Sequence, residues 1–255
     1  MAAMLEGRKG LIVGIANERS IAWAAARSFS EAGAELAATW QNDKARPHVE
    51  PLLDGLGVGL KLPLDVADDA QLAAVFDAIS ARWGKLDFLL HSIAYAPKAD
   101  LHGRVVDSSR EGFLTAMDVS CHSLLRLCRL AEPLMRGGGS VTTMTYLGGA
   151  EVVPNYGLMG PVKAALESCV RYLAMELGAS NIRVNAVSPG PIATRAASGL
   201  AQFDTLVQDS AKRSPLRREI SIDDVGPLCA FLASDSASAI TGTTLYVDAG
   251  YHVLN

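Results

Sequence analysis

Tyr156 and Lys163 are the residues of this chain whose types and spacing best suit chemistry. They stand seven positions apart in the segment Pro154-Asn-Tyr-Gly-Leu-Met-Gly-Pro-Val-Lys163, and seven residues make almost two turns of an α-helix. The spacing predicts both side chains on one face of one helix. There the phenol would donate a proton, and the ammonium would lower the phenol's pKa and bind a polar ligand. A packed tyrosine ring and a solvated lysine amine give the same spacing, so the rest of the chain must decide.

The composition describes one folded domain without a basic surface. The 255 residues are 49% hydrophobic and 20% charged, which is enough to bury a large core, and we read residues 1–255 as a single domain. A net charge of -4 with scattered cations argues against a nucleic-acid partner. The four cysteines show no Cys-x-x-Cys spacing and no metal-binding pattern with the five histidines, so we expect reduced thiols and no metal site.

The amino-terminal segment does not read as a targeting signal. Charged Glu6, Arg8 and Lys9 interrupt its short apolar start, and no segment approaches the ~20 apolar residues of a membrane span. We therefore expect a cytoplasmic protein that does not enter a membrane.

Strand-like and helix-like patterns alternate along the chain. Apolar runs predict strands at 10–14, 35–40, 57–64, 86–93, 140–145, 182–187 and 244–248. Helical periodicity predicts helices at 21–29, 70–82, 109–135 and 222–232, with another carrying Lys163. This order predicts an α/β fold: a Rossmann-like, doubly wound parallel sheet flanked by helices, with ligands beyond the carboxyl ends of the strands. The long irregular stretch 190–214 suits a substrate lid.

The loop after the first predicted strand suits a phosphate group. Gly14 permits a turn, a hydroxyl at Ser20 replaces the second glycine of the usual dinucleotide fingerprint, and Ala22 permits close helix packing. A structural turn followed by a helix that Ser20 caps explains the same residues.

The ends of the second and third strands favour a nicotinamide dinucleotide. Gln41 can bond ribose hydroxyls, and no cation stands beside it to neutralise a 2'-phosphate, which favours NADH. Lys44 and Arg46 follow closely, so NADPH is not excluded. Asp65 can accept a hydrogen bond from the adenine amino group, with Val66 against the adenine ring. Alternatively, Asp65 can cap a helix.

Six ordered motifs together resemble the FabI-type enoyl-acyl-carrier-protein reductases of the short-chain dehydrogenase/reductase superfamily, over about 5–252. They are Gly14-x5-Ser20-x-Ala22, Gln41-Asn-Asp-Lys, His91-Ser-Ile-Ala, Thr145-Tyr-Leu-Gly, Asn155-Tyr-x6-Lys163 and Gly190-Pro-Ile-x-Thr194. Most short-chain dehydrogenases instead carry Tyr-x3-Lys and a TGxxxGxG loop.

The resemblance implies NADH-dependent reduction of the trans-2 double bond of enoyl thioesters, delivered by acyl carrier protein during fatty-acid elongation, in a homotetramer. The positions that match the family's catalytic residues are Tyr146, Tyr156 and Lys163. Its cofactor contacts fall on Gly14, Ser20, Ile21, Gln41, Asp65, Val66, Ile93, Lys163, Ile192, Ala193, Thr194, Arg195 and Ala196. The residues expected along the acyl chain are Ala96, Tyr146, Tyr156, Met159, Leu200 and Phe203.

Some positions depart from the family's pattern and leave alternatives open. Pro161 removes a backbone donor within the predicted catalytic helix, which predicts either a kink that shifts Tyr156 from Lys163 or a tolerated early turn. The ending Asp248-Ala249-Gly250 replaces Asp-Gly-Gly. The alternatives are a divergent paralogue that reduces another unsaturated or carbonyl substrate, and a nucleotide-sensing protein on the same fold.

Overall fold

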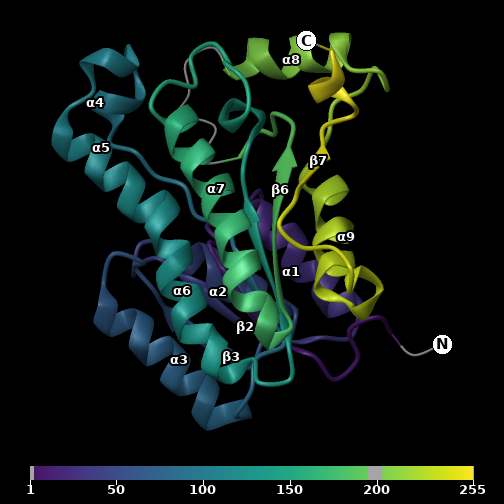
Figure 1. Ribbon diagram of the computed structural model, residues 1–255. Coiled ribbons are helices and arrows are strands. Elements are labelled where there is room, and N and C mark those ends of the chain that lie inside the picture. The colour runs from purple at the N-terminus through teal and green to yellow at the C-terminus, as the bar shows by residue number, and fades with distance from the viewer. Residues whose placement is uncertain (1–2, 195–202, 255) are drawn as a thin grey trace.

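Parallel strands form the centre of the molecule, and helices cover both faces of the sheet (Figure 1). The computed structural model describes residues 3–194 and 203–254. The described strands form a seven-stranded sheet in the order β3-β2-β1-β4-β5-β6-β7. They are β1 (Lys9–Val13), β2 (Glu35–Trp40), β3 (Leu60–Pro63), β4 (Phe88–His91), β5 (Gly139–Met144), β6 (Ile182–Pro189) and β7 (Thr244–Val247). The order reverses at β1, where β2 and β4 pair on either side.

The helices connect the strands as crossovers. The α-helices are α1 (Ile21–Glu31), α2 (Arg46–Gly55), α3 (Asp69–Trp83), α4 (Lys98–Leu101), α5 (Arg110–Met117), α6 (Ser123–Ala131), α7 (Met159–Leu177), α8 (Phe203–Arg213) and α9 (Ile222–Ala233). A π-helical turn, Asp118–His122, joins α5 to α6. Parallel strands need such crossovers, because the chain must return to the same end of the sheet before each new strand begins.

Two hydrophobic cores lie on opposite faces of the sheet. Successive residues of a strand point to opposite faces, so Leu11 and Val13 pack in one core and Ile12 in the other. The first core lies under α3, α6 and α7, and the second under α1, α2 and α9. Burial on both faces explains why the strands read as continuous apolar runs in the sequence.

The predicted fold class is confirmed, and the boundaries differ in detail. The third and fourth strands are shorter than the predicted 57–64 and 86–93. The predicted helix 109–135 is divided by the π-helical turn into α5 and α6. Sequence reasoning missed α2, whose prolines at 47 and 51 hide its periodicity. The prediction of irregular structure over 190–214 is wrong for Phe203–Arg213, which form α8.

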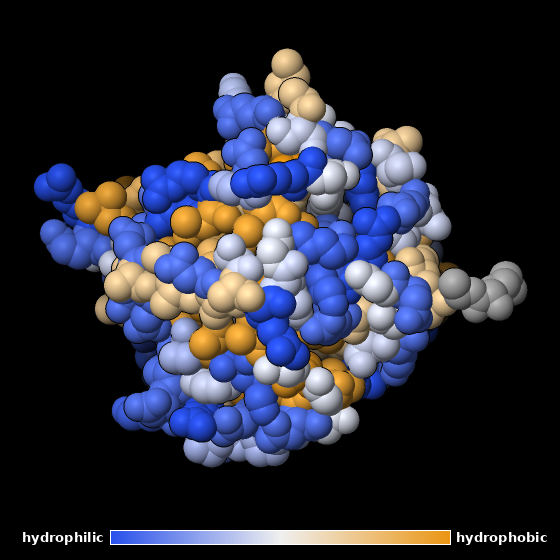
Figure 2. Space-filling model, turned by 90° about the horizontal axis from the view of Figure 1, so that it is seen from below, coloured by the Kyte–Doolittle hydropathy of each residue, from blue (hydrophilic) through white to orange (hydrophobic). Residues whose placement is uncertain are grey.

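The described residues contain no helix long and apolar enough to cross a membrane. They also contain no group of three or more His, Cys, Asp or Glu residues placed to hold a metal ion. The four cysteines are free thiols, three of them buried. The end of the molecule that Figure 1 shows at the bottom carries mostly hydrophilic side chains with small hydrophobic patches between them (Figure 2).

Candidate active site

The structure brings the predicted site residues to one edge of the sheet. Each strand pair is parallel, so the carboxyl ends of the strands meet at one edge, near the top of Figure 1. The predicted residues that follow a strand there are Gly14 after β1, Gln41 after β2, Asp65 and Val66 after β3, Ile93 after β4, Tyr146 after β5, and Ile192, Ala193 and Thr194 after β6. Because β1 is the point where the strand order reverses, this edge is where an open α/β sheet binds its ligand.

Tyr156 does not lie on the helix that carries Lys163, so that prediction is wrong. The helix α7 begins at Met159, three residues after the tyrosine. Asn155 and Gly157, on either side of Tyr156, have φ angles of 64° and 54°, which a right-handed helix cannot include. Tyr156 therefore reaches the site from a tight turn, and Lys163 reaches it from the second turn of α7.

Pro161 causes no kink between the two residues. It is the third residue of α7, and the first backbone N–H groups of a helix have no intrahelical acceptor. The missing N–H of the proline therefore removes no helical hydrogen bond. The amide of the next residue, Val162, still donates to the carbonyl of Leu158 at 3.4 Å. The sequence left open a kink at Pro161 or a proline tolerated in the first turn of the helix, and the structure shows the second.

The carboxyl end of β5 links the three predicted catalytic side chains. The ring centroids of Tyr146 and Tyr156 are 4.8 Å apart, with the ring planes inclined by 57°. The hydroxyl of Tyr146 is buried and has no hydrogen-bond partner among the described residues. The ammonium of Lys163 is buried and donates to the carbonyl oxygen of Met144, the last residue of β5, at 2.8 Å. Tyr146 stands two residues after that carbonyl, so the end of β5 fixes both groups.

Burial sets the protonation of these groups. It lowers the pKa of Lys163 to about 8, although Cys121 and Glu167 partly oppose the shift. Burial raises the pKa of Tyr156, and the neighbouring Tyr146 and Glu167 raise it further. The prediction that the lysine lowers the pKa of this phenol is not confirmed. At neutral pH the site therefore contains neutral phenols that can donate hydrogen bonds, beside a mostly protonated amine.

The phosphate-loop residues form a tight turn at the start of α1. Gly14 has a φ angle of 115°, and a Cβ atom there would lie 2.1 Å from the carbonyl oxygen of Ser92. The Ser20 hydroxyl accepts hydrogen bonds from the amides of Ala16, at 3.0 Å, and Asn17, at 2.9 Å. Ser20 therefore occupies the N-cap position, but its side chain does not cap α1. The alternative interpretation of Ser20 as a side-chain helix cap is wrong. The start of α1, at Ile21, is left open to an anion.

The adenosine-side residues lie at the ends of β2 and β3. Gln41 is exposed directly after β2, and Val66 is buried after β3. A carboxylate oxygen of Asp65 accepts from the amide of Ala67 at 3.0 Å, whereas the helix α3 is capped by Asp68. The helix-cap interpretation of Asp65 is therefore wrong, and the interpretation as an adenine contact stays a prediction.

The remaining predicted residues lie in or against the hydrophobic core, in the segment that follows β6, or outside the described residues. Ala96 and Met159 are buried in the same hydrophobic cluster as Tyr156, and Ile93 and Tyr146 pack against it. The backbone amide of Thr194 donates to the carbonyl of Ile192 at 2.7 Å. Arg195, Ala196 and Leu200 lie outside the described residues, and Phe203 is described only as the first residue of α8.

Thr145 and Gly148 stand in one of the six motifs, but sequence reasoning did not predict how they position this site. A Cβ atom on Gly148 would lie 2.3 Å from the Tyr156 ring, so only glycine allows the ring to pack there. The hydroxyl of Thr145 donates to the carboxylate of Glu167, on α7, at 2.6 Å. This bond joins the end of β5 to the helix that carries Lys163. The neighbouring glycines at 148 and 149 were the available signal, whereas a backbone acceptor such as the Met144 carbonyl leaves none.

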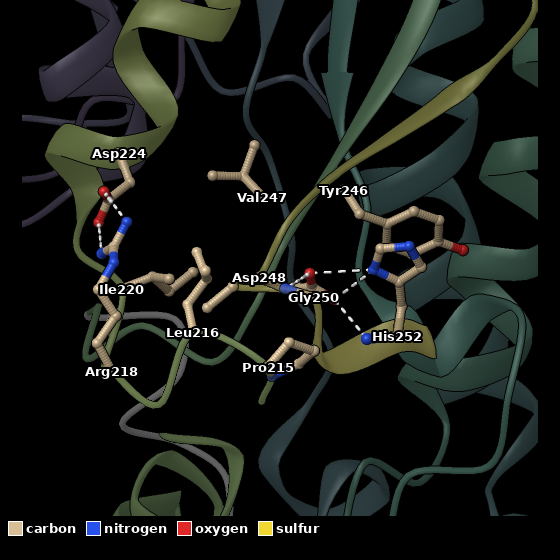
Figure 3. Close-up of a pocket in the computed structure, with 11 residues that line it drawn as sticks. Pro215, Leu216, Arg218, Ile220, Asp224, Tyr246, Val247, Asp248, Gly250 and His252 are labelled. Carbon is tan, nitrogen blue, oxygen red and sulfur yellow. Dashed lines mark hydrogen bonds and ion pairs between the residues drawn. The ribbon is translucent and has the colours of Figure 1, made fainter. Parts of the chain in front are cut away.

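A cavity of about 450 Å³ lies at the end of β7 (Figure 3). None of the residues predicted to act on a ligand lines it. Its polar side chains are paired: Arg218 forms two hydrogen bonds with Asp224, and Asp248 accepts from the backbone amide of His252 at 2.8 Å. The His252 ring stacks on Tyr246 at 4.0 Å. These contacts tie the chain end to β7 and indicate a structural role.

The profile of one protein family, described as "Enoyl-(Acyl carrier protein) reductase", matches residues 14–252. Similar characterised proteins are Enoyl-[acyl-carrier-protein] reductase [NADH] 1 of Rhizobium meliloti, 46% identical over 99% of this chain and 93% of that protein, and Enoyl-[acyl-carrier-protein] reductase [NADH] FabI of a Nostoc species, 48% identical over 98% of each.

The solved structures give the same similarity in three dimensions. The enoyl-(acyl-carrier-protein) reductase of Anaplasma phagocytophilum, solved in complex with NAD, is 44% identical, with a TM-score of 0.96 over 100% of this chain and 97% of that one. The Bacillus cereus enoyl-acyl carrier protein reductase, solved with NADP+ and an indole naphthyridinone, is 44% identical, with a TM-score of 0.97 over 99% of each chain.

Proposed function

Because this chain belongs to the enoyl-acyl-carrier-protein reductase family, we propose that Tyr146, Tyr156 and Lys163 carry out the family's reaction in it. The chain is an oxidoreductase that uses NADH to reduce the trans-2 double bond of an enoyl thioester. The observation that carries the residue assignment is the convergence of two packed phenols and one buried ammonium at the end of β5.

The residues at the edge of the sheet fit a dinucleotide. At Gly14 the backbone approaches the neighbouring strand so closely that a Cβ atom has no room, as a phosphate-binding turn requires. The start of α1 carries no side-chain cap and can bind a pyrophosphate. Among the described residues, the ammonium of Lys163 donates one hydrogen bond, to a backbone carbonyl, and it has further N–H groups for ribose hydroxyls. Gln41 and Asp65 would hold the adenosine end.

The reaction develops negative charge on the thioester oxygen of the substrate. When bound, the reduced nicotinamide supplies the hydride that adds to the β-carbon of the enoyl group. Tyr156 donates a hydrogen bond to the thioester oxygen and stabilises the enolate, and its raised pKa keeps the phenol protonated at neutral pH. Lys163 binds the ribose and keeps the local potential positive. The Tyr146 ring packs on Tyr156 and flanks the acyl chain.

The acyl chain would lie against the apolar side of the site. Ala96 and Met159, buried in the same hydrophobic cluster as Tyr156, would contact it. Leu200 and Phe203 fall in the stretch 190–214, which we propose to be the substrate lid, and Arg195 and Ala196 would complete the cofactor contacts there. A lid excludes water from the developing charge, which strengthens each hydrogen bond to it.

The substrate would arrive on acyl carrier protein, and the chain would act as a homotetramer in the cytoplasm. Large apolar side chains on α5 and α7 support the assembly: Phe113, Leu114, Tyr172 and Met175 are exposed in the single chain. Exposed apolar residues gathered on helices are typical of subunit interfaces. The molar mass in solution, measured by light scattering, tests this assembly directly.

The test of the proposed function is the loss of NADH absorbance with a trans-2-enoyl thioester, measured for the natural chain, Tyr156→Phe and the matched control Tyr246→Phe, whose ring stacks on His252. We expect turnover by the natural chain and the control. For Tyr156→Phe we expect kcat to fall at least about a hundredfold, which is the loss seen when one hydrogen-bond donor to a developing oxyanion is removed. Full activity of Tyr156→Phe would contradict the assignment. NADH binding without turnover by the natural chain would favour a sensing protein, and turnover of ketones alone a divergent paralogue.

A further inference from the structure

The segment that follows β2 lies where Rossmann-type sheets distinguish NADH from NADPH. In such sheets a side chain after the second strand contacts the adenosine ribose, and an arginine nearby accommodates a 2'-phosphate. In this chain β2 ends at Trp40, Gln41 follows it, and Arg46 begins α2. Arg46 is therefore the arginine closest in sequence to the ribose position, in a chain whose relatives include NADH-dependent reductases.

The guanidinium of Arg46 is already held by two partners. Its Nε and Nη2 atoms donate to the carboxylate of Glu50 at 2.9 Å and 3.1 Å. Its Cζ atom lies 5.5 Å from the centroid of the Trp40 ring, at the end of β2. The Trp40 ring lies under the guanidinium, and the carboxylate occupies one of the two edges through which arginine forms a paired contact to a phosphate.

The charges of this segment balance. Residues 41–50 contain two acids, Asp43 and Glu50, and two cations, Lys44 and Arg46. The Arg46 side chain lowers the pKa of Glu50, chiefly through their hydrogen bonds, so the carboxylate is ionised at neutral pH. A phosphate on the same edge of Arg46 would have to displace this carboxylate, and a phosphate on the other edge would still meet its negative charge. A ribose 2'-hydroxyl carries no charge and meets no such barrier.

We propose that Glu50 is a specificity-determining residue that holds Arg46 in an ion pair and thereby disfavours a cofactor with a 2'-phosphate. The inference rests on the proposed function, because it concerns the adenosine end of the same dinucleotide site. According to this proposal, the preference for NADH over NADPH arises because Glu50 holds a cation, and not because a cation is absent.

The test measures binding of adenosine fragments that lack the nicotinamide, so that its outcome does not depend on turnover. Calorimetric titrations of the full chain with 5'-AMP and with adenosine 2',5'-bisphosphate are compared for the natural chain and Glu50→Gln. We expect the bisphosphate to bind about threefold to fivefold more tightly to Glu50→Gln, the scale of one exposed, solvent-screened ion pair. The affinity for 5'-AMP should stay within about twofold.

Two further variants separate the possible causes. Glu31→Gln removes an equal charge from the exposed end of α1 and should leave both affinities unchanged. Adding Arg46→Ala to Glu50→Gln should abolish the gain in bisphosphate affinity. An unchanged affinity in Glu50→Gln, or an equal gain in Glu31→Gln, would overturn the proposal. So would a gain that persists without Arg46, because Lys44 would then supply the cation. If the natural chain reduces no enoyl thioester while the fragment affinities follow the expected pattern, the proposed function fails and the role of Glu50 stands.

Discussion

The rings of Tyr146 and Tyr156 pack against each other at 4.8 Å between centroids, although one follows β5 and the other stands in the turn before α7. The contact links the two segments that position the reacting groups. The Tyr156 ring also lies against Gly148, so it is held from the β5 side as well as from its own turn. The Tyr146 ring gains this packing, but its buried hydroxyl finds no acceptor among the described residues.

Tyr146→Phe should therefore stabilise the cofactor-free protein. A buried hydroxyl without a partner costs about 1–3 kcal/mol, and the phenylalanine ring keeps the contact with Tyr156. We expect the free energy of unfolding in urea to rise by about 1 kcal/mol, while kcat/KM for the enoyl thioester falls. In the control Tyr246→Phe, whose half-buried ring keeps its stacking on His252, stability should change by less than about 0.5 kcal/mol. A destabilised Tyr146→Phe would show that the hydroxyl has a partner in solution.

Lys163→Met should also stabilise the protein at pH 7 while abolishing activity. Burial lowers the pKa of Lys163 to about 8, against 10.5 for the exposed side chain. At pH 7 both the folded and the unfolded chain hold the proton, so the folded chain bears the full cost of the buried charge. Between pH 8 and 10.5 the unfolded chain binds more protons, so the natural chain gains stability as the pH rises.

The advantage of Lys163→Met should therefore be on the order of 2–3 kcal/mol at pH 7 and should shrink toward zero near pH 10.5. Urea unfolding of the cofactor-free protein at several pH values measures it. The control Lys98→Met, at an exposed position, should show no such trend. An advantage that is independent of pH would mean that packing, and not the buried charge, causes it.

Gly14→Ala should remove dinucleotide binding and destabilise the fold. The new Cβ atom would lie 2.1 Å from the Ser92 carbonyl oxygen, and the φ angle of 115° is one that L residues rarely adopt. We expect a loss of about 3 kcal/mol or more in the free energy of unfolding, with no measurable NADH binding by calorimetry. Gly59→Ala, where nothing lies within 4 Å of the new atom, should cost less than about 1 kcal/mol and keep the affinity for NADH. A Gly14→Ala protein with normal stability would show that the loop is free to move.

Periodicity predicted the strands and the parallel sheet because burial on both faces leaves a continuous apolar run, as in Gly10-Leu-Ile-Val. The same signal failed at Tyr156, because helical spacing takes no account of the φ angles at Asn155 and Gly157. It also gave no indication of the Met144 carbonyl that holds Lys163. A backbone acceptor is the same in every residue type, so only the folded chain shows which one is used.

Ala249→Gly should stabilise the protein without affecting the site. Ala249 follows β7 with a φ angle of 58°, a left-handed conformation that costs an L residue roughly 1–2 kcal/mol. The turn cannot relax, because the Asp248 carboxylate accepts from the amides of Gly250, at 2.9 Å, and His252, at 2.8 Å.

Glycine removes this strain but has more freedom to lose on folding, which costs about 0.5–1 kcal/mol, so the expected net gain for Ala249→Gly is about 0.5–1 kcal/mol in urea unfolding. The control Ala150→Gly, at an exposed position with a φ angle of -100°, has no strain to relieve and should lose stability by about 0.5–1 kcal/mol. Opposite signs for the two changes would identify the backbone angle as the cause, since both remove the same methyl group. A loss of stability at both positions would mean that the strain at Ala249 costs less than the conformational freedom that glycine loses on folding.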